Sequence, residues 1–173
     1  MREVIELQAL SLAHAPLMVE GALESVSEIN PWMDWCNRQF DVETARQFIS
    51  EQIDAKRSGA AYEFALFNDQ GVYLGGGGVN SIDHRSNRAN IGYWIRSSQT
   101  RNGYGTAALE ALVGWARAHT RLNRLEVVVA TGNLASQRVA QKGGATWEGV
   151  AKSRLYNNGE YLDAHIYAFT RDA

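Results

Sequence analysis

Residues 99–107 read Gln-Thr-Arg-Asn-Gly-Tyr-Gly-Thr-Ala and contain two glycines, Gly103 and Gly105, two positions apart. They lie between a predicted strand over 90–96 and a predicted helix that Gly105 opens. Glycine lets main-chain N–H groups approach a ligand closely, and a helix N-terminus adds unpaired donors and partial positive charge. The stretch therefore indicates phosphate binding, although a plain loop that needs glycine for its positive φ would have the same composition.

Two well-known phosphate-binding motifs fit this stretch poorly. A P-loop needs Gly-Lys-Ser/Thr, which is missing here. The dinucleotide fingerprint matches in spacing, with Gly103-x-Gly105-x-x-Ala108 and with Glu126 about 20 residues further on. However, the glycines trail their strand by several residues, and Glu126 lies near the start of its own strand. An NAD-binding oxidoreductase is therefore the weaker interpretation.

Outward from this stretch, strands and helices alternate without a linker, a repeat or a low-complexity segment, so we predict one domain over residues 1–173. Helices are expected after Pro16, Asp41, Gly105 and Asn133, with Asp41 and Asn133 as N-caps. Strands are expected at 4–10, 61–67, 71–79, 90–96, 125–130, 146–156 and 161–170. This order indicates an α/β (α+β) fold. The run from Gly75 to Gly78 is interpreted as a bulged or closely approached strand in the sheet.

Composition narrows the function classes. The 173 residues are 45% hydrophobic and 21% charged, with a net charge of −2, which is typical of a globular domain without general attraction to nucleic acid or membrane. No apolar run approaches the roughly 20 residues of a membrane span, and the N-terminus is acidic, unlike a signal peptide. The four histidines lack metal-ligand spacing. We expect a cytoplasmic protein without a metal, and a homodimer stays open.

Five segments in chain order carry a family resemblance. They are Asp34-Trp35, Asn90-Ile91-Gly92-Tyr93-Trp94, the glycine stretch at 103–107, the Asn-x-x-Ser helix from Asn133 to Gly144, and a closing hairpin over 152–163. Together they resemble the GNAT superfamily of N-acetyltransferases, and most closely its RimJ/RimL-like group of ribosomal-protein N-terminal acetyltransferases. The resemblance implies a mixed, mostly antiparallel, twisted sheet of about seven strands flanked by helices, in which two splayed central strands bind coenzyme A.

The same resemblance implies an activity. It predicts direct attack of a primary amine on the thioester of acetyl-CoA, with either a protein N-terminus or a small amine as acceptor. A catalytically impaired acyl-CoA-binding module of the same fold is the alternative, because the hairpin has Leu155 where the group has a glutamate that acts as base. An apolar side chain cannot remove a proton, so the base is not assigned.

The cofactor contacts are likewise implied by the resemblance. Main-chain amides of residues 101–107 hold the pyrophosphate, with Asn102 in place of the usual Gln or Arg and with Arg101 as a substitute charge partner. The main chain of the strand ending at Trp94, Ile95 and Arg96 faces the pantetheine arm and the thioester. The complete predicted cofactor set is Trp94, Ile95, Arg96, Arg101, Asn102, Gly103, Tyr104, Gly105, Thr106, Ala107, Asn133 and Ser136.

Ser136 is the predicted catalytic residue, because it matches the serine that protonates the leaving sulfur in this group. Many other relatives use a tyrosine four residues later, where this chain has Ala140. Cys36 has no histidine nearby in sequence to activate it, which argues against an acetyl-cysteine step. Amphipathic or charged side chains predicted to line the acceptor groove are Trp32, Asp34, Trp35, Glu63 and Tyr156.

Overall fold

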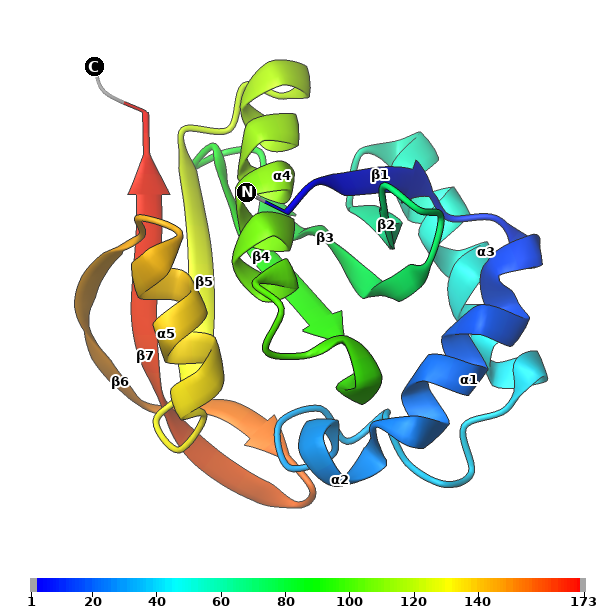
Figure 1. Ribbon diagram of the computed structural model, residues 1–173. Helices are drawn as coiled ribbons and strands as arrows, with labels where there is room; N and C mark the ends of the chain where they lie inside the picture. Colours follow the sequence, from blue (N-terminus) through cyan, green and yellow to red (C-terminus); the bar gives the residue numbers. More distant parts are fainter. Residues whose placement is uncertain (1–2, 172–173) are drawn as a thin grey trace.

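A seven-stranded sheet with the order β1-β2-β3-β4-β5-β7-β6 organises the molecule (Figure 1). The computed structural model describes residues 3–171. The strands are β1 (Ile5–Ala9), β2 (Tyr62–Asn68), β3 (Tyr73–Asp83), β4 (Arg88–Ile95), β5 (Arg124–Ala130), β6 (Thr146–Asn157) and β7 (Glu160–Thr170). Of the six neighbouring strand pairs among the described residues, β4 with β5 is parallel and the other five are antiparallel. The predicted mixed, mostly antiparallel sheet flanked by helices is confirmed.

Helices cover both faces of this sheet. They are α1 (Ala15–Glu24), α2 (Val26–Ile29), α3 (Val42–Ser58), α4 (Tyr104–His119) and α5 (Leu134–Lys142), with short 3-10 turns at Leu12–His14 and Ser97–Gln99. One apolar core joins α4 and α5 to the sheet, and a second joins α1 and α3 to its other face. Figure 1 shows α1 and α3 beside the β2–β4 half, with α5 beside β5 and β7. The sheet thus separates two cores.

Local sequence signals set the helix ends. Asp41 caps α3 by accepting a hydrogen bond from the Thr44 main-chain N–H at 2.8 Å, and Asn133 caps α5 through the Ser136 N–H at 3.1 Å. Both predicted caps are confirmed. Helix α4 begins at Tyr104, one residue before the predicted start, because Gly103 takes the left-handed conformation (φ +83°) as its N-cap.

The glycine run on β3 is bulged where it meets β2, as predicted. The register shifts so that Leu66 lies opposite Gly75 whereas Phe67 lies opposite Tyr73. A Cβ on Gly75 would lie 2.1 Å from the main-chain oxygen of Trp94, and a Cβ on Gly76 would lie 2.9 Å from the indole nitrogen of Trp94. The close approach of β4 therefore leaves no room for a side chain larger than that of glycine at positions 75 and 76.

Strands β4 and β5 run apart after a short paired segment. Pairing extends from Arg88–Arg124 to Asn90–Glu126, and the rest of β4 pairs with β3 alone (Figure 1). The predicted splay of the central strands is therefore confirmed. The opening leaves main-chain groups of β4 without a strand partner on that side.

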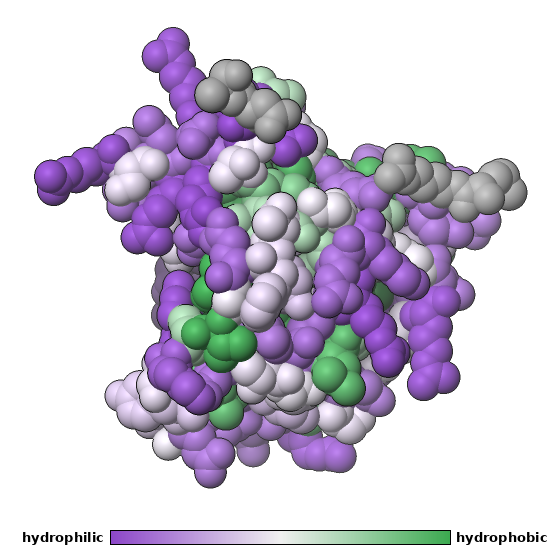
Figure 2. All heavy atoms as spheres, turned by 90° about the vertical axis from the view of Figure 1, so that its left-hand side faces the viewer, coloured by the Kyte–Doolittle hydropathy of each residue, from purple (hydrophilic) through white to green (hydrophobic). Residues whose placement is uncertain are grey.

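The molecular surface adds two findings. No helix in the described range 3–171 has the length and hydrophobicity of a membrane span. Figure 2 shows that the face carrying α5, β6 and β7 is mostly hydrophilic, with its apolar side chains in separate small patches. The hairpin formed by β6 and β7 carries four exposed large side chains, Trp147, Val150, Tyr156 and Tyr161. The possible homodimer remains a prediction.

Candidate active site

The gap between β4 and β5 is bridged by two hydroxyls. Tyr93 on β4 and Ser136 in the first turn of α5 share a hydrogen bond of 3.0 Å between their side-chain oxygens. Asn133 holds the start of α5 through the Ser136 N–H. Burial raises the pKa of the Tyr93 phenol to about 12, and the Ser136 bond opposes that rise. Both hydroxyls are therefore protonated at neutral pH, which is the state a proton donor needs.

The glycine stretch lies at the open end of this gap. Arg101 (φ +66°) and Gly103 (φ +83°) both adopt left-handed main-chain conformations, which turn the chain sharply into α4. The N-cap residue Gly103 provides no side-chain hydrogen bond to the helix. The first main-chain N–H groups of α4 therefore point out of the helix without a side-chain acceptor. A row of main-chain donors at a helix N-terminus fits a pyrophosphate. The residues present therefore match the phosphate end of coenzyme A.

Individual side chains of the stretch have further partners. Gly105 faces α5, where an added Cβ would lie 3.1 Å from Val139, so its small size also permits α4 and α5 to pack. The Tyr104 hydroxyl lies 3.4 Å from the amide of Asn68 at the end of β2. Arg101 and Asn102 are exposed, and Thr106 and Ala107 are half-buried in the first turn. Their predicted contacts with the cofactor remain predictions.

Arg96, which is predicted to face the cofactor through its main chain, also has partners within the protein. Its guanidinium binds two carboxylates of α1, Glu20 at 2.6 Å and Glu24 at 2.6 Å. Its main-chain N–H donates to Leu74 at 2.8 Å, and its carbonyl accepts from Gln99 at 2.9 Å. These internal partners tie the end of β4 to α1, and the predicted main-chain contacts of Trp94, Ile95 and Arg96 with the cofactor remain predictions.

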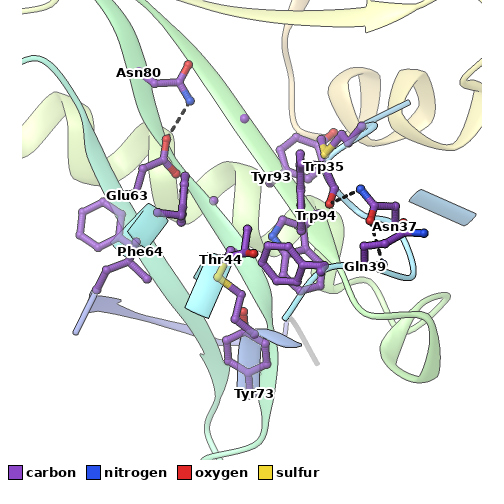
Figure 3. Close-up of a pocket in the computed structure, with 18 residues that line it drawn as sticks. Trp35, Asn37, Gln39, Thr44, Glu63, Phe64, Tyr73, Asn80, Tyr93 and Trp94 are labelled. Carbon is purple, nitrogen blue, oxygen red and sulfur yellow. Dashed lines mark hydrogen bonds between the residues drawn. The ribbon is translucent and has the colours of Figure 1, made fainter. Parts of the chain in front are cut away.

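A cavity of about 670 Å³ lies on the α1/α3 side of β4 (Figure 3). Aromatic and methionine residues make up half of its lining: Met18, Met33, Trp35, Phe40, Phe48, Phe64, Tyr73, Tyr93 and Trp94. Trp35 meets Trp94 edge-to-face with ring centroids 5.5 Å apart. Gly76 and Gly92 form bare parts of the sheet floor. The cavity has the apolar character of small-ligand sites.

The structure brings two of the five predicted acceptor residues into this cavity, Trp35 and Glu63. Trp32 instead packs against the loop before α5, where an added Cβ on Gly132 would lie 3.1 Å from its ring. Asp34 is exposed outside the cavity, and Tyr156 is 63% exposed, with its ring centroid 4.9 Å from that of Tyr161. The scattered aromatic residues of the sequence therefore divide between the cavity wall and the surface.

Glu63 is the carboxylate of the cavity. Its Oε1 accepts a hydrogen bond from Asn80 at 2.8 Å, and Asn80 in turn accepts one from Asn90 at 3.0 Å. Burial raises the pKa of the Glu63 carboxyl above its usual value, and the Asn80 bond works against this rise. The absence of a side chain at Gly78 makes room for this carboxylate, because a Cβ there would lie 2.3 Å from Glu63 Oε2.

Sequence reasoning missed most of the cavity wall and the role of Tyr93. Phe48 lies in α3, and the sequence carries no sign that this position of the helix lines a cavity. Tyr93 and Ser136 are 43 positions apart, so their contact depends on the splay of the strands. The sequence does carry one signal of the polar part of the site. It is the pair Asn80 and Asn90, which are polar residues within largely apolar strand segments and lie ten positions apart on a hairpin.

Cys36 is fully buried, and its thiol contacts the main-chain oxygen of Ala22 at 3.3 Å. Burial raises the pKa of this thiol to about 11, which disfavours the thiolate that a nucleophile needs. Among the described residues, no group of three His, Cys, Asp or Glu side chains is placed to hold a metal ion.

Comparison with known proteins identifies the family. The model of the acetyltransferase (GNAT) domain family matches residues 5–146. The chain belongs to the GNAT acetyltransferase family. It is 25% identical to the Escherichia coli ribosomal-protein-serine acetyltransferase, over 96% of this chain and 92% of that protein. It is 28% identical to Bacillus subtilis YdaF, provisionally named a ribosomal N-acetyltransferase, over 98% of this chain and 92% of that protein.

A solved structure gives the same result. RimL, a ribosomal L7/L12 α-N-protein acetyltransferase in complex with coenzyme A, superposes with a TM-score of 0.88 at 27% identity, covering 96% of this chain and 94% of that one. This GNAT protein is an acetyl-CoA-dependent N-acetyltransferase, so the predicted activity and cofactor are confirmed.

The oxidoreductase interpretation is wrong. Glu126 was its ribose-binding candidate, but Glu126 lies third in β5 and forms an ion pair with Arg124 at 2.8 Å. The 3-10 turn Ser97–Gln99 also separates β4 from the glycines, so the tight strand-to-helix turn of a dinucleotide site is missing.

Proposed function

We propose that the acceptor is the α-amine at the N-terminus of a polypeptide, which enters the cavity beside β4. The observation that carries this is the position of β4: Gly92 and Trp94 line the cavity, and the Tyr93 hydroxyl between them reaches Ser136 on the opposite face of the sheet. The acceptor side and the coenzyme side of the site therefore share one strand. Full-length similarity to enzymes named for ribosomal proteins supports the polypeptide acceptor.

In this proposal, Ser136 is the catalytic acid. The amine attacks the thioester directly, the N–C bond forms and the C–S bond breaks. Ser136 donates its proton to the departing sulfur, and Tyr93 supplies the replacement proton through their 3.0 Å hydrogen bond. The main chain of Trp94 and Ile95 faces the thioester, and the amides of residues 101–107 hold the pyrophosphate, with Arg101 and Thr106 as side-chain contacts. Asn133 fixes Ser136 as the helix cap.

A small amine is the second candidate acceptor. The volume of about 670 Å³ falls within the range of roughly 300–1,000 Å³ that small-molecule sites occupy. Its apolar wall would accept the body of such a molecule as well as the first side chain of a peptide.

A matched peptide panel separates these acceptors. The panel consists of lysine-free peptides that have a free N-terminus and differ only in their first residue. Each has a control peptide in which the N-terminus is blocked and one lysine is added. Acetyl-CoA consumption is followed by thiol release, and mass spectrometry locates the acetyl group. We expect acetylation of the free α-amine and none of the blocked peptide. Turnover of free amino acids or other small amines alone would contradict the polypeptide acceptor.

A further inference from the structure

The cavity contains one group that titrates as an acid in the ordinary range. Its polar wall residues from other elements are neutral: Asn37 and Gln39 before α3, Thr44 on α3, Asn80 on β3, and the phenols Tyr73 and Tyr93. No Asp, His, Lys or Arg is among the residues that line it. Burial raises the pKa of both phenols, so neither is a base near neutral pH. Glu63 is therefore the only lining residue that can carry a negative charge there.

The Glu63 carboxylate lies over the middle of the sheet rather than at its edge. Oε2 would be 2.3 Å from a Cβ on Gly78, so the carboxylate is directly above that residue. Gly78 lies opposite Gly92 of β4. Neighbouring strands are about 4.8 Å apart, which puts the carboxylate roughly one strand spacing from β4. Gly92 lies in the part of β4 that has no pairing with β5, so the carboxylate lies beside the opening between these strands.

One oxygen of this carboxylate is open. Asn80 donates to Oε1, and the described residues provide no donor to Oε2. Every fully buried side-chain polar atom in the described range has a hydrogen-bond partner, so Oε2 is in contact with the cavity space. The Asn90–Asn80–Glu63 chain fixes the carboxylate while leaving one oxygen for a ligand.

We propose that Glu63 binds the ammonium group of the acceptor and takes its proton, and that the acceptor carries this amine on an apolar group. The inference rests on the proposed function, in which the acceptor enters this cavity. The side chains of Trp35, Phe48 and Tyr73 receive the apolar group, and Oε2 receives the ammonium. This assigns the base that Leu155 cannot provide.

The protons balance as follows. One N–H bond of the ammonium breaks and its proton moves to the Glu63 carboxylate, which frees the nitrogen electron pair. Attack forms the N–C bond and breaks the C–S bond; the second nitrogen proton leaves to water while Ser136 protonates the sulfur, so Ser136 is reprotonated from water through Tyr93. Coenzyme A leaves as the thiol, and Glu63 releases its proton to water. The net reaction yields one amide, one thiol and one proton.

Ligand binding tests this without any turnover. Isothermal titration calorimetry in the presence of coenzyme A compares 2-phenylethylammonium with 2-phenylethanol, a neutral molecule of similar shape. At pH 8 the unchanged protein should bind the ammonium roughly ten- to a hundredfold more tightly, as expected for a charge-assisted hydrogen bond. Glu63→Gln should abolish this preference and leave the alcohol affinity unchanged.

A matched control removes the same charge elsewhere. Glu51 on the exposed face of α3 contacts Gln47 at 3.1 Å and lies outside the cavity lining, so Glu51→Gln should keep the full preference. Retention of the preference by Glu63→Gln, or failure of the unchanged protein to bind either molecule, would overturn the proposal.

Kinetics then separate this inference from the choice of acceptor. With any amine that is acetylated, Glu63→Gln should lower kcat/KM on the order of a hundredfold and leave the KM for acetyl-CoA unchanged. If small apolar amines react and peptides do not, the polypeptide acceptor fails while the role of Glu63 stands. If Glu63→Gln acetylates a peptide at the rate of the unchanged protein, the role of Glu63 fails and the polypeptide acceptor stands.

Discussion

Tyr93 and Ser136 couple two elements at a single hydrogen bond. The tyrosine belongs to the sheet, whereas the serine belongs to a helix whose first turn is capped by Asn133. Both donors are fixed before the acceptor arrives, which reduces the reorganisation needed when charge develops on sulfur.

Removing either hydroxyl should slow acetyl transfer without weakening coenzyme A binding. We expect Ser136→Ala to lower kcat on the order of a hundredfold, because a positioned proton donor typically contributes that much. Tyr93→Phe should have a similar effect, and the double variant should be little slower than either single one. Timed assays of thiol release measure kcat, and calorimetry with coenzyme A measures the binding affinity. An unchanged kcat in Ser136→Ala would leave that serine only its structural role.

Glu63 should weaken the fold in exchange for reactivity. Its folded pKa is raised by burial above the usual value of 4.5, so protonation favours the folded state and ionisation at higher pH disfavours it. Glu63→Gln should therefore unfold at an equal or higher Tm at pH 8, by about 2–4 °C for each 1 kcal/mol regained. The difference should vanish below pH 4.5, where the carboxyl is protonated in both states. A lower Tm at pH 8 would contradict this account.

At the residue scale, the sequence predicts main-chain sites better than side-chain partners. Positive φ at Gly103 and the cap at Asn133 follow from the chemistry of those residues alone. The destinations of Trp32, Trp35 and Tyr156 depend on distant packing, and local sequence contains no trace of it. Arg96 shows the same limit, since its carboxylate partners lie 72 and 76 positions away.

The closing hairpin anchors one wall of the cavity. Asn157, at the end of β6, is buried and accepts a hydrogen bond from the Asp34 N–H at 2.8 Å. Its amide donates to the carbonyls of Pro31 at 3.0 Å and Asn30 at 3.2 Å. The segment that carries Met33 and Trp35 into the cavity is therefore held by a strand end more than 120 positions later in the chain.

Loosening this anchor should affect the acceptor more than the cofactor. Asn157→Ala leaves buried polar groups unpaired and should destabilise the fold by about 1–3 kcal/mol. The KM for the acceptor should rise, because Trp35 is no longer fixed, whereas the affinity for coenzyme A should change little. Denaturant unfolding and steady-state kinetics measure the two effects. Equal weakening of both substrates would argue against a local role for this hairpin.

The glycine run of β3 allows a matched comparison between two glycines. A Cβ on Gly78 would lie 2.5 Å from the main-chain oxygen of Tyr62 as well as against Glu63, whereas Gly114 in α4 is exposed and has nothing within 4 Å. Gly78→Ala should destabilise the fold by about 1–3 kcal/mol through overpacking. Gly114→Ala should stabilise it by up to about 1 kcal/mol through helix propensity. Urea unfolding should rank the two variants in opposite directions from the unchanged protein.

At the element scale, the order of strands and helices was predictable because each boundary has a local signal. Asp41 and Asn133 cap helices, Asn158-Gly159 turns the last hairpin, and the β-branched run before Ala130 marks a buried strand. The glycine run was recognised as a bulge, but its link to Glu63 and Trp94 required the cross-strand register.

The whole molecule joins the two halves of its site through one sheet. The acceptor cavity lies against β2, β3 and β4, and the coenzyme side lies between β4 and β5, so a single continuous sheet carries both. We expect one cooperative unfolding transition. Coenzyme A at a hundred times its Kd should add about 2.7 kcal/mol of stability, a rise in Tm of about 5–10 °C. NAD at the same concentration should leave Tm unchanged. Two separate transitions, or a shift with NAD, would contradict this picture.

The most direct test is a crystal structure with a bisubstrate analogue in which coenzyme A is joined through an acetyl bridge to the α-amine of a short peptide with an apolar first residue. The account predicts the pyrophosphate on the amides of residues 101–107 and the sulfur within about 3.5 Å of the Ser136 or Tyr93 hydroxyl. The peptide nitrogen should face Glu63, with the first side chain between Trp35 and Phe48. A peptide bound outside the cavity, with its nitrogen directed away from Glu63, would contradict it.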